Sequence, residues 1–113
     1  MKDFYFFLRH ILDAIEDVKE SIGDFSRKEF LENKDVREAN IRRIEVIGEA
    51  VRNLSEDFKK RYSKVSWREI IGTRDKMIHH YFGVDLDIVW NIIKKDLPEL
   101  KDNIEEILEK EGD

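Results

Sequence analysis

The stretch DFYFFLRHILDAIEDVKESI, residues 3–22, places apolar side chains three and four residues apart. This spacing matches the 3.6-residue turn of an α-helix and gathers the apolar side chains on one face. Charged residues occupy most of the other positions. The pattern therefore predicts a helix that packs its apolar face against other helices and ends at Gly23.

The same spacing recurs along the rest of the chain. It predicts long helices over about 36–54, 67–81 and 86–108, with short helices beginning near Arg27 and Ser55. Two segments, 26–29 and 66–69, have the spacing of a capping box, and Asp85 is a candidate N-cap. Pro98 is expected to kink or split the last helix, because proline removes a backbone hydrogen bond and clashes with the preceding turn.

Strand alternation, hairpin dipeptides and internal repeats are absent from the sequence. We therefore predict an all-α fold, an antiparallel up-and-down bundle of four main helices with one or two short ones, in a single domain over residues 1–113. Gly48 and Gly72 lie inside predicted helices, where glycine costs roughly 1 kcal/mol relative to alanine. A close approach of another helix is expected at each.

Composition restricts the function classes. The chain has no cysteine, so disulfides and thiolate metal sites are excluded. Asp13, Glu16 and Asp17 follow the apolar N-terminal run within one helix, which excludes a signal peptide or membrane span there. We expect a cytoplasmic protein with no membrane contact.

Charge is distributed unevenly along the chain. The net charge is −5, yet residues 59–84 alone carry seven Lys/Arg and two Asp/Glu. Such a basic segment can supply the phosphate contacts that dominate affinity for nucleic acids, although it can also be an ordinary solvated face. Candidate contacts to RNA phosphate are Lys64, Arg68 and Lys76.

The segment Arg74–Tyr81 gathers the side chains best suited to chemistry. His79 and His80 are adjacent, and histidine is the side chain whose ordinary pKa lies nearest neutral pH. Arg74 adds a planar, permanently charged guanidinium suited to phosphate. A polar helix end without function is the simpler alternative for a His-His pair.

Helical geometry sorts these residues. On one continuous helix Arg74 and Tyr81 lie two turns apart on one face, whereas His79 lies about 140° around the axis from Arg74. Either the helix ends or distorts at His79, or a second copy of the chain completes the site. Asp75 precedes His79 by four residues, so on a helix it could orient the imidazole and raise its pKa.

Metal binding is not expected in this segment. His79, His80 and Asp75 offer suitable ligands, but adjacent histidines diverge by about 100° on a helix, unlike the i, i+4 pair that binds zinc. We predict no metal site and no cofactor.

The motif Arg74-x4-His79-x-Tyr81 resembles the Arg-x4-His-x-Tyr signature of HEPN-domain proteins of the HepT type, which are small all-helical ribonuclease toxins. Further matching segments follow in the order and spacing typical of that family, and the resemblance covers about residues 4–108. They are Ile47-Gly48-Glu49-Ala50, Leu54-Ser55, Trp67-Arg68-Glu69-Ile70, Gly72, Phe82-Gly83-Val84-Asp85, Val89-Trp90 and Asp96-Leu97-Pro98.

The resemblance implies a homodimer in which two motif copies meet in a cleft and cleave RNA without a metal. His79 would then act as general acid or base and Arg74 would stabilise the transition state, with Tyr81 and Asp75 supporting the site. It also implies a minimal nucleotidyltransferase antitoxin that silences the toxin by transferring AMP to Tyr81. The family often has Asn where this chain has Asp75, and an aspartate there would repel phosphate.

Two other hypotheses remain open. The chain could be a non-catalytic helical module that binds nucleotide or RNA, or that only partners a nucleotidyltransferase. It could also be a structural helical dimer in which the motif is incidental.

Overall fold

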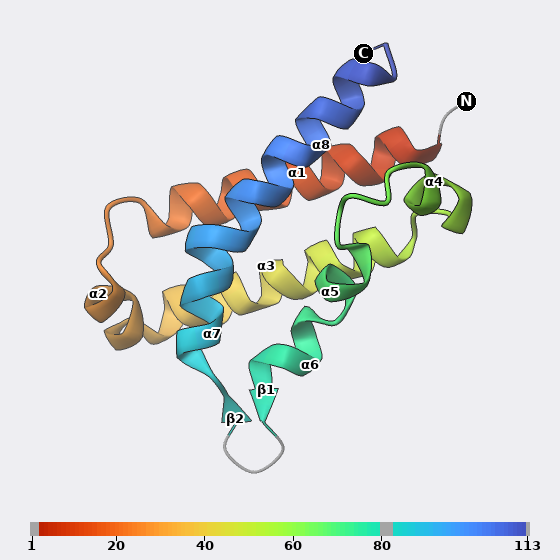
Figure 1. Ribbon diagram of the computed structural model, residues 1–113. Helices are drawn as coiled ribbons and strands as arrows, with labels where there is room; N and C mark the ends of the chain where they lie inside the picture. Colours follow the sequence, from red (N-terminus) through yellow and green to blue (C-terminus); the bar gives the residue numbers. More distant parts are fainter. Residues whose placement is uncertain (1–2, 80–82, 113) are drawn as a thin grey trace.

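The computed structural model describes residues 3–79 and 83–112, and of His79 only the backbone. Helix α1 (Asp3–Ile22) packs along α3 (Lys34–Arg52). The C-terminal helical segment, which comprises α7 (Leu86–Asn91), the π-helical turn η1 (Ile92–Asp96) and α8 (Leu97–Lys110), crosses this pair, as Figure 1 shows. The predicted all-α bundle is confirmed.

The core lies between α1, α3 and the C-terminal segment. Each contributes the apolar face that its three- and four-residue spacing predicts, and the largest fully buried side chains come from these elements and from α2 and α6. They are Leu8, Ile11, Val18, Phe30, Ile44, Ile47, Val51, Met77, Val89, Ile92, Ile104 and Ile107.

The first long helix begins and ends as its sequence predicts. Gly23 follows Ile22 with a positive φ of 49°, which suits glycine because it has no Cβ. Helix α2 (Arg27–Glu32) then begins with a complete capping box: Glu29 N donates to Ser26 Oγ, and Ser26 N donates to the Glu29 carboxylate.

Short helix α4 (Glu56–Arg61) joins the ends of α1 and α8 through aromatic and polar contacts. The rings of Phe4 and Phe58 stack with their centroids 4.8 Å apart. Trp67 Nε1 donates to the Tyr62 carbonyl at 3.1 Å, and the Tyr62 hydroxyl donates to the Glu111 carboxylate. This cluster fixes the long connection that leads to the basic segment.

The prediction of one helix over 67–81 is wrong. The structure has α5 (Trp67–Ile71) and α6 (Thr73–Met77) separated at Gly72, followed by a two-stranded antiparallel ladder of β1 (Ile78–His79) and β2 (Gly83–Val84). Ser66 precedes α5 without a side-chain cap hydrogen bond, so the second predicted capping box is also wrong. The two-residue strands are too short to show the alternation by which strands are recognised.

The two interior glycines behave differently. A Cβ on Gly48 would lie 3.4 Å from the Ile70 carbonyl oxygen and 3.7 Å from Thr73 Oγ1, so α3 approaches α5 and α6 as closely as predicted. At Gly72 a Cβ would meet only the carbonyls of Arg68 and Glu69 in the preceding helix. The second predicted helix contact is therefore wrong, because Gly72 separates two helices instead of lying inside one.

Pro98 does not interrupt the helical course of the C-terminal segment. The preceding turn widens into η1, in which Leu97 N donates to the Ile92 carbonyl, and Pro98 lies in the first turn of α8. Proline is tolerated there because the first N–H groups of a helix need no intrahelical acceptor. Within the described residues, no helix combines the length and apolar character needed to span a membrane.

Candidate functional site

Arg74 lies in α6, which packs against the middle of α3. Its Nε donates to Glu45 Oε2 at 3.1 Å, and the pair joins residues 29 apart in sequence. The Arg74 side chain is 65% exposed, whereas that of Glu45 is only 24% exposed. The carboxylate therefore holds the guanidinium through Nε, and among the described residues neither terminal amino group has a hydrogen-bond partner.

Glu45 is a site residue that sequence reasoning did not assign. The sequence places it near the apolar stripe of its helix, where most carboxylates are simply solvated. Only the packing of α6 on α3 brings it to Arg74. Its spacing within α3 carries no signal for this contact, because the contact depends on a long connection and not on helical periodicity.

His79 lies in β1, where its backbone pairs with Gly83. Its side chain, together with His80 and Tyr81, lies outside the described residues. Helix α6 ends at Met77, so the helix-end alternative predicted for His79 is confirmed. The predictions that Asp75 and His79, or Arg74 and Tyr81, share one helix face lose their basis because no helix continues beyond Met77.

Asp75 is exposed in the first turn of α6. Within the described part of the chain it has no ion pair. A carboxylate in the first turn of a helix is stabilised by the helix dipole, so Asp75 can be explained by its helix position without any role in a site. Its charge also stands next to Arg74, where it lowers the positive potential offered to a phosphate.

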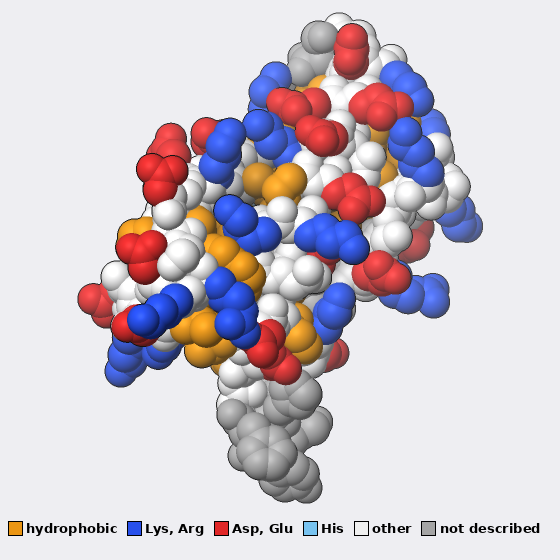
Figure 2. Space-filling model, turned by 60° about the vertical axis from the view of Figure 1, so that its left-hand side comes forward, with side chains coloured by type: hydrophobic (Ala, Val, Ile, Leu, Met, Phe, Trp, Pro, Cys, Tyr) orange, Lys and Arg blue, Asp and Glu red, His pale blue; other side chains and the backbone are white. Residues whose placement is uncertain are grey.

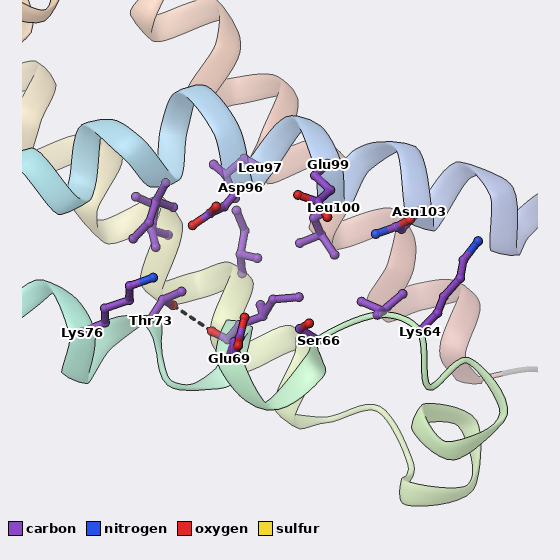
Figure 3. Close-up of a pocket in the computed structure, with 15 residues that line it drawn as sticks. Lys64, Ser66, Glu69, Thr73, Lys76, Asp96, Leu97, Glu99, Leu100 and Asn103 are labelled. Carbon is purple, nitrogen blue, oxygen red and sulfur yellow. Dashed lines mark hydrogen bonds between the residues drawn. The ribbon is translucent and has the colours of Figure 1, made fainter.

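Two of the three predicted phosphate contacts line one cavity. The cavity has a volume of about 150 Å³ and lies between α3, α5, α6 and the η1–α8 segment. Figure 3 shows Lys76 and Lys64 at opposite ends of it, with Asp96 and Glu99 along the facing helix. Arg68 is exposed and does not line the cavity.

The two lysines differ in their partners. Lys64 Nζ lies 2.9 Å from Glu106 Oε1, and Lys110 Nζ lies 3.4 Å from the same oxygen. Hydrogen bonds from Lys64 and Lys110 hold the pKa of Glu106 below its usual range. Lys76 has no ion pair among the described residues, so it is the better placed of the two for a phosphate.

Among the residues that the structure describes, no three His, Asp or Glu side chains lie close enough together to hold a metal ion. The charged groups of this region are the Arg74 guanidinium, the Lys76 ammonium and the carboxylates of Glu45 and Asp75. The two cations can bind an anion such as a phosphate.

A helical bundle that carries an Arg-x4-His-x-Tyr motif is the arrangement of the HEPN class. The family model described as "Ribonuclease HepT-like" matches residues 11–107, and the chain belongs to this family of ribonucleases.

Curated relatives support this assignment. A protein named "Putative RNase" from Caldanaerobacter subterraneus subsp. tengcongensis is 45% identical over 93% of this chain and 94% of its own length. A "Probable ribonuclease HepT" from Thermococcus cleftensis is 41% identical over 89% of this chain and 92% of its own.

A longer relative also contains this sequence pattern. It is named "Gamma-glutamylcyclotransferase and putative RNase", comes from Methanocaldococcus jannaschii and is 43% identical over 96% of this chain. The chain spans 49% of that relative's length. No solved structure matches the chain.

Proposed function

We propose that the chain is the toxin of a toxin–antitoxin pair and cleaves RNA as a metal-independent endoribonuclease. The observation that carries this proposal is the exposed Arg74 guanidinium, which Glu45 is the one described residue to hold, through Nε, in a chain of the HepT-like ribonuclease family. A fixed cation with two free amino groups matches the paired oxygens of a phosphodiester.

The proposed reaction is the attack of a ribose 2′-oxygen on the adjacent phosphorus. His79 accepts the 2′-hydroxyl proton while the new P–O bond forms, and Arg74 stabilises the negative charge that develops on the non-bridging oxygens. The bond from phosphorus to the 5′-oxygen then breaks, and that oxygen receives a proton from the imidazolium of His79. The products are a 2′,3′-cyclic phosphate and a 5′-hydroxyl, so this step consumes no water.

A homodimer and an antitoxin complete the proposal. Two copies of the motif segment would form one cleft, with Tyr81 at the scissile phosphate. A minimal nucleotidyltransferase would transfer AMP to the Tyr81 hydroxyl and so add bulk and negative charge to the cleft. Incubation with such a partner and ATP is expected to add one AMP to the intact protein, whereas Tyr81→Phe should gain none.

The decisive experiment is cleavage of single-stranded RNA in the presence of a chelator. Arg74→Ala and His79→Ala are each expected to lower the cleavage rate by at least about 10²-fold, as loss of a transition-state partner does. Arg42→Ala and His10→Ala are matched controls, since both residues are exposed on other helices. Thermal unfolding should show all four variants folded, and cleavage that persists in either motif variant contradicts the assignment.

A second candidate function is RNA binding without turnover. The exposed Asp75 favours it, because a carboxylate beside Arg74 opposes a second negative charge in the transition state. This function predicts RNA binding that weakens with salt, with no cleavage products from the purified protein.

A further inference from the structure

A second cavity lies on the other side of the C-terminal segment from the Lys76 cavity. It has a volume of about 350 Å³ and lies between the C-terminal half of α1 and the η1–α8 segment. Its floor is apolar and includes Val18 and Ile22 from α1 and Ile93 and Leu97 from the crossing segment. Leu97 lines both cavities, so they flank the same helical turn.

Three lysines surround this floor, namely Lys19, Lys94 and Lys101. Within the described part of the chain none of them has an ion pair, whereas Lys59, Lys64 and Lys110 each have a glutamate partner. Asp102 is the one carboxylate among the described lining residues. In a chain with a net charge of −5 this cavity is therefore a local site of positive charge.

The wall that carries Lys94 is the π turn Ile92–Asp96. Single π turns inside α-helices are frequent at functional sites. The Lys94 ammonium lies 5.4 Å from the centre of the Trp90 ring. On the face that Figure 2 presents, basic side chains lie beside exposed hydrophobic ones, with acidic side chains among them.

Shape and charge together restrict the ligand. A volume of this size falls at the lower end of small-molecule pockets, about 300–1,000 Å³, which suits one flat group better than the long face of a partner helix. An apolar floor can pack against a nucleobase, and the rim lysines, which have no ion pair within the described residues, can donate hydrogen bonds to phosphate oxygens. A nucleotide combines both parts in one ligand.

We propose that the Lys19–Lys94–Lys101 cavity binds one nucleotide of single-stranded RNA, with the base on the apolar floor and the flanking phosphates on the lysines. The inference rests on the proposed ribonuclease function, for which it supplies a substrate contact away from Arg74. Contacts of this kind raise the affinity for RNA without taking part in the reaction.

The test uses full-length protein in which Arg74→Ala prevents cleavage during the binding measurement. Adding Lys94→Glu and Lys101→Glu together is expected to weaken binding of a single-stranded oligonucleotide roughly tenfold and to reduce the salt slope by about one per lysine. Lys28→Glu and Lys95→Glu together are the charge-matched control, because both residues are exposed and neither lines the cavity. Thermal unfolding checks that all variants are folded.

The outcomes separate this inference from the ribonuclease proposal. Loss of binding in the Lys94/Lys101 variant but not in the Lys28/Lys95 variant supports the cavity, even if the wild type cleaves no RNA. Equal binding by all variants overturns it, even if the wild type cleaves RNA well. Binding of 5′-AMP that depends on these lysines, without such dependence for the oligonucleotide, also overturns it, as does equally tight binding of a polyglutamate peptide.

Discussion

Glu45 Oε2 accepts a hydrogen bond from Arg74 Nε at 3.1 Å, and through this contact α3 fixes the position of the motif arginine. The Glu45 side chain is partly buried against the bundle, whereas the Arg74 side chain is largely exposed. A long arginine side chain loses rotamer freedom when it binds a ligand. Because Glu45 already restricts that freedom, part of the entropic cost of binding phosphate is met in the free protein.

Removal of the Glu45 carboxylate tests this positioning role. Glu45→Ala is expected to lower kcat up to about fivefold, because an ion pair with an exposed partner contributes up to about 1 kcal/mol. Glu45→Gln keeps an acceptor for Nε and should retain more activity. Steady-state cleavage assays separate kcat from KM, and a purely structural role would instead lower the melting temperature and leave kcat of the folded fraction unchanged.

Neutralisation of Asp75 should improve contact with RNA. Asp75→Asn removes a negative charge beside Arg74, so binding of an oligonucleotide is expected to strengthen severalfold at low salt and less at high salt. Glu38→Gln is a control, since it removes an exposed carboxylate of α3 that does not line the Lys76 cavity. Equal effects of the two changes would mean that only the net charge matters.

Substitution of Gly48 tests how closely α5 and α6 must approach α3. Gly48→Leu is expected to destabilise the protein by about 1–3 kcal/mol, because the added atoms overpack against the Ile70 carbonyl and Thr73. Gly48→Ala should change stability by less than about 1 kcal/mol, since its gain in helix propensity offsets a contact at 3.4 Å. Chemical denaturation measures both, and a neutral Gly48→Leu would contradict the packing.

The buried Asn40 connects α1 with α3. Its side chain is fully buried, and its Nδ2 donates to Ser21 Oγ at 3.0 Å and to the Val36 carbonyl at 2.8 Å, while Arg43 donates to its Oδ1. Asn40→Ala is expected to cost about 1–3 kcal/mol of unfolding free energy. A double-mutant cycle with Ser21→Ala should give a coupling of at least about 0.5 kcal/mol, and additive effects would show that the hydrogen bond contributes nothing measurable.

Alkaline pH should weaken the contact between α4 and the end of α8. The hydrogen bond to Glu111, with burial, raises the pKa of Tyr62 above its ordinary value of 10.0. Because the folded pKa is the higher one, the stabilisation is complete below pH 10 and is lost as the pH rises through the folded pKa. Alkaline denaturation of Tyr62→Phe should lack this component, whereas Tyr5→Phe should retain it.

Local pattern was enough to predict most of the helices. The spacing of apolar residues identified α1, α3 and the C-terminal segment, and Ser26 and Asp85 cap α2 and α7 through their own side chains as predicted. These features are decided within a few residues, because helical periodicity and capping depend on near neighbours. The prediction failed between Gly72 and Val84, where segments too short for a periodic signal follow one another.

The sequence by itself therefore determined the helical class, the buried faces and the Arg74-x4-His79-x-Tyr81 motif, since all three are written in local spacing and residue type. Only the tertiary structure decided that α6 ends at Met77, that Glu45 holds Arg74, and that Lys19, Lys94 and Lys101 surround one cavity. These relationships join residues far apart in the chain. They arise from the packing of whole helices against one another, which no local pattern records.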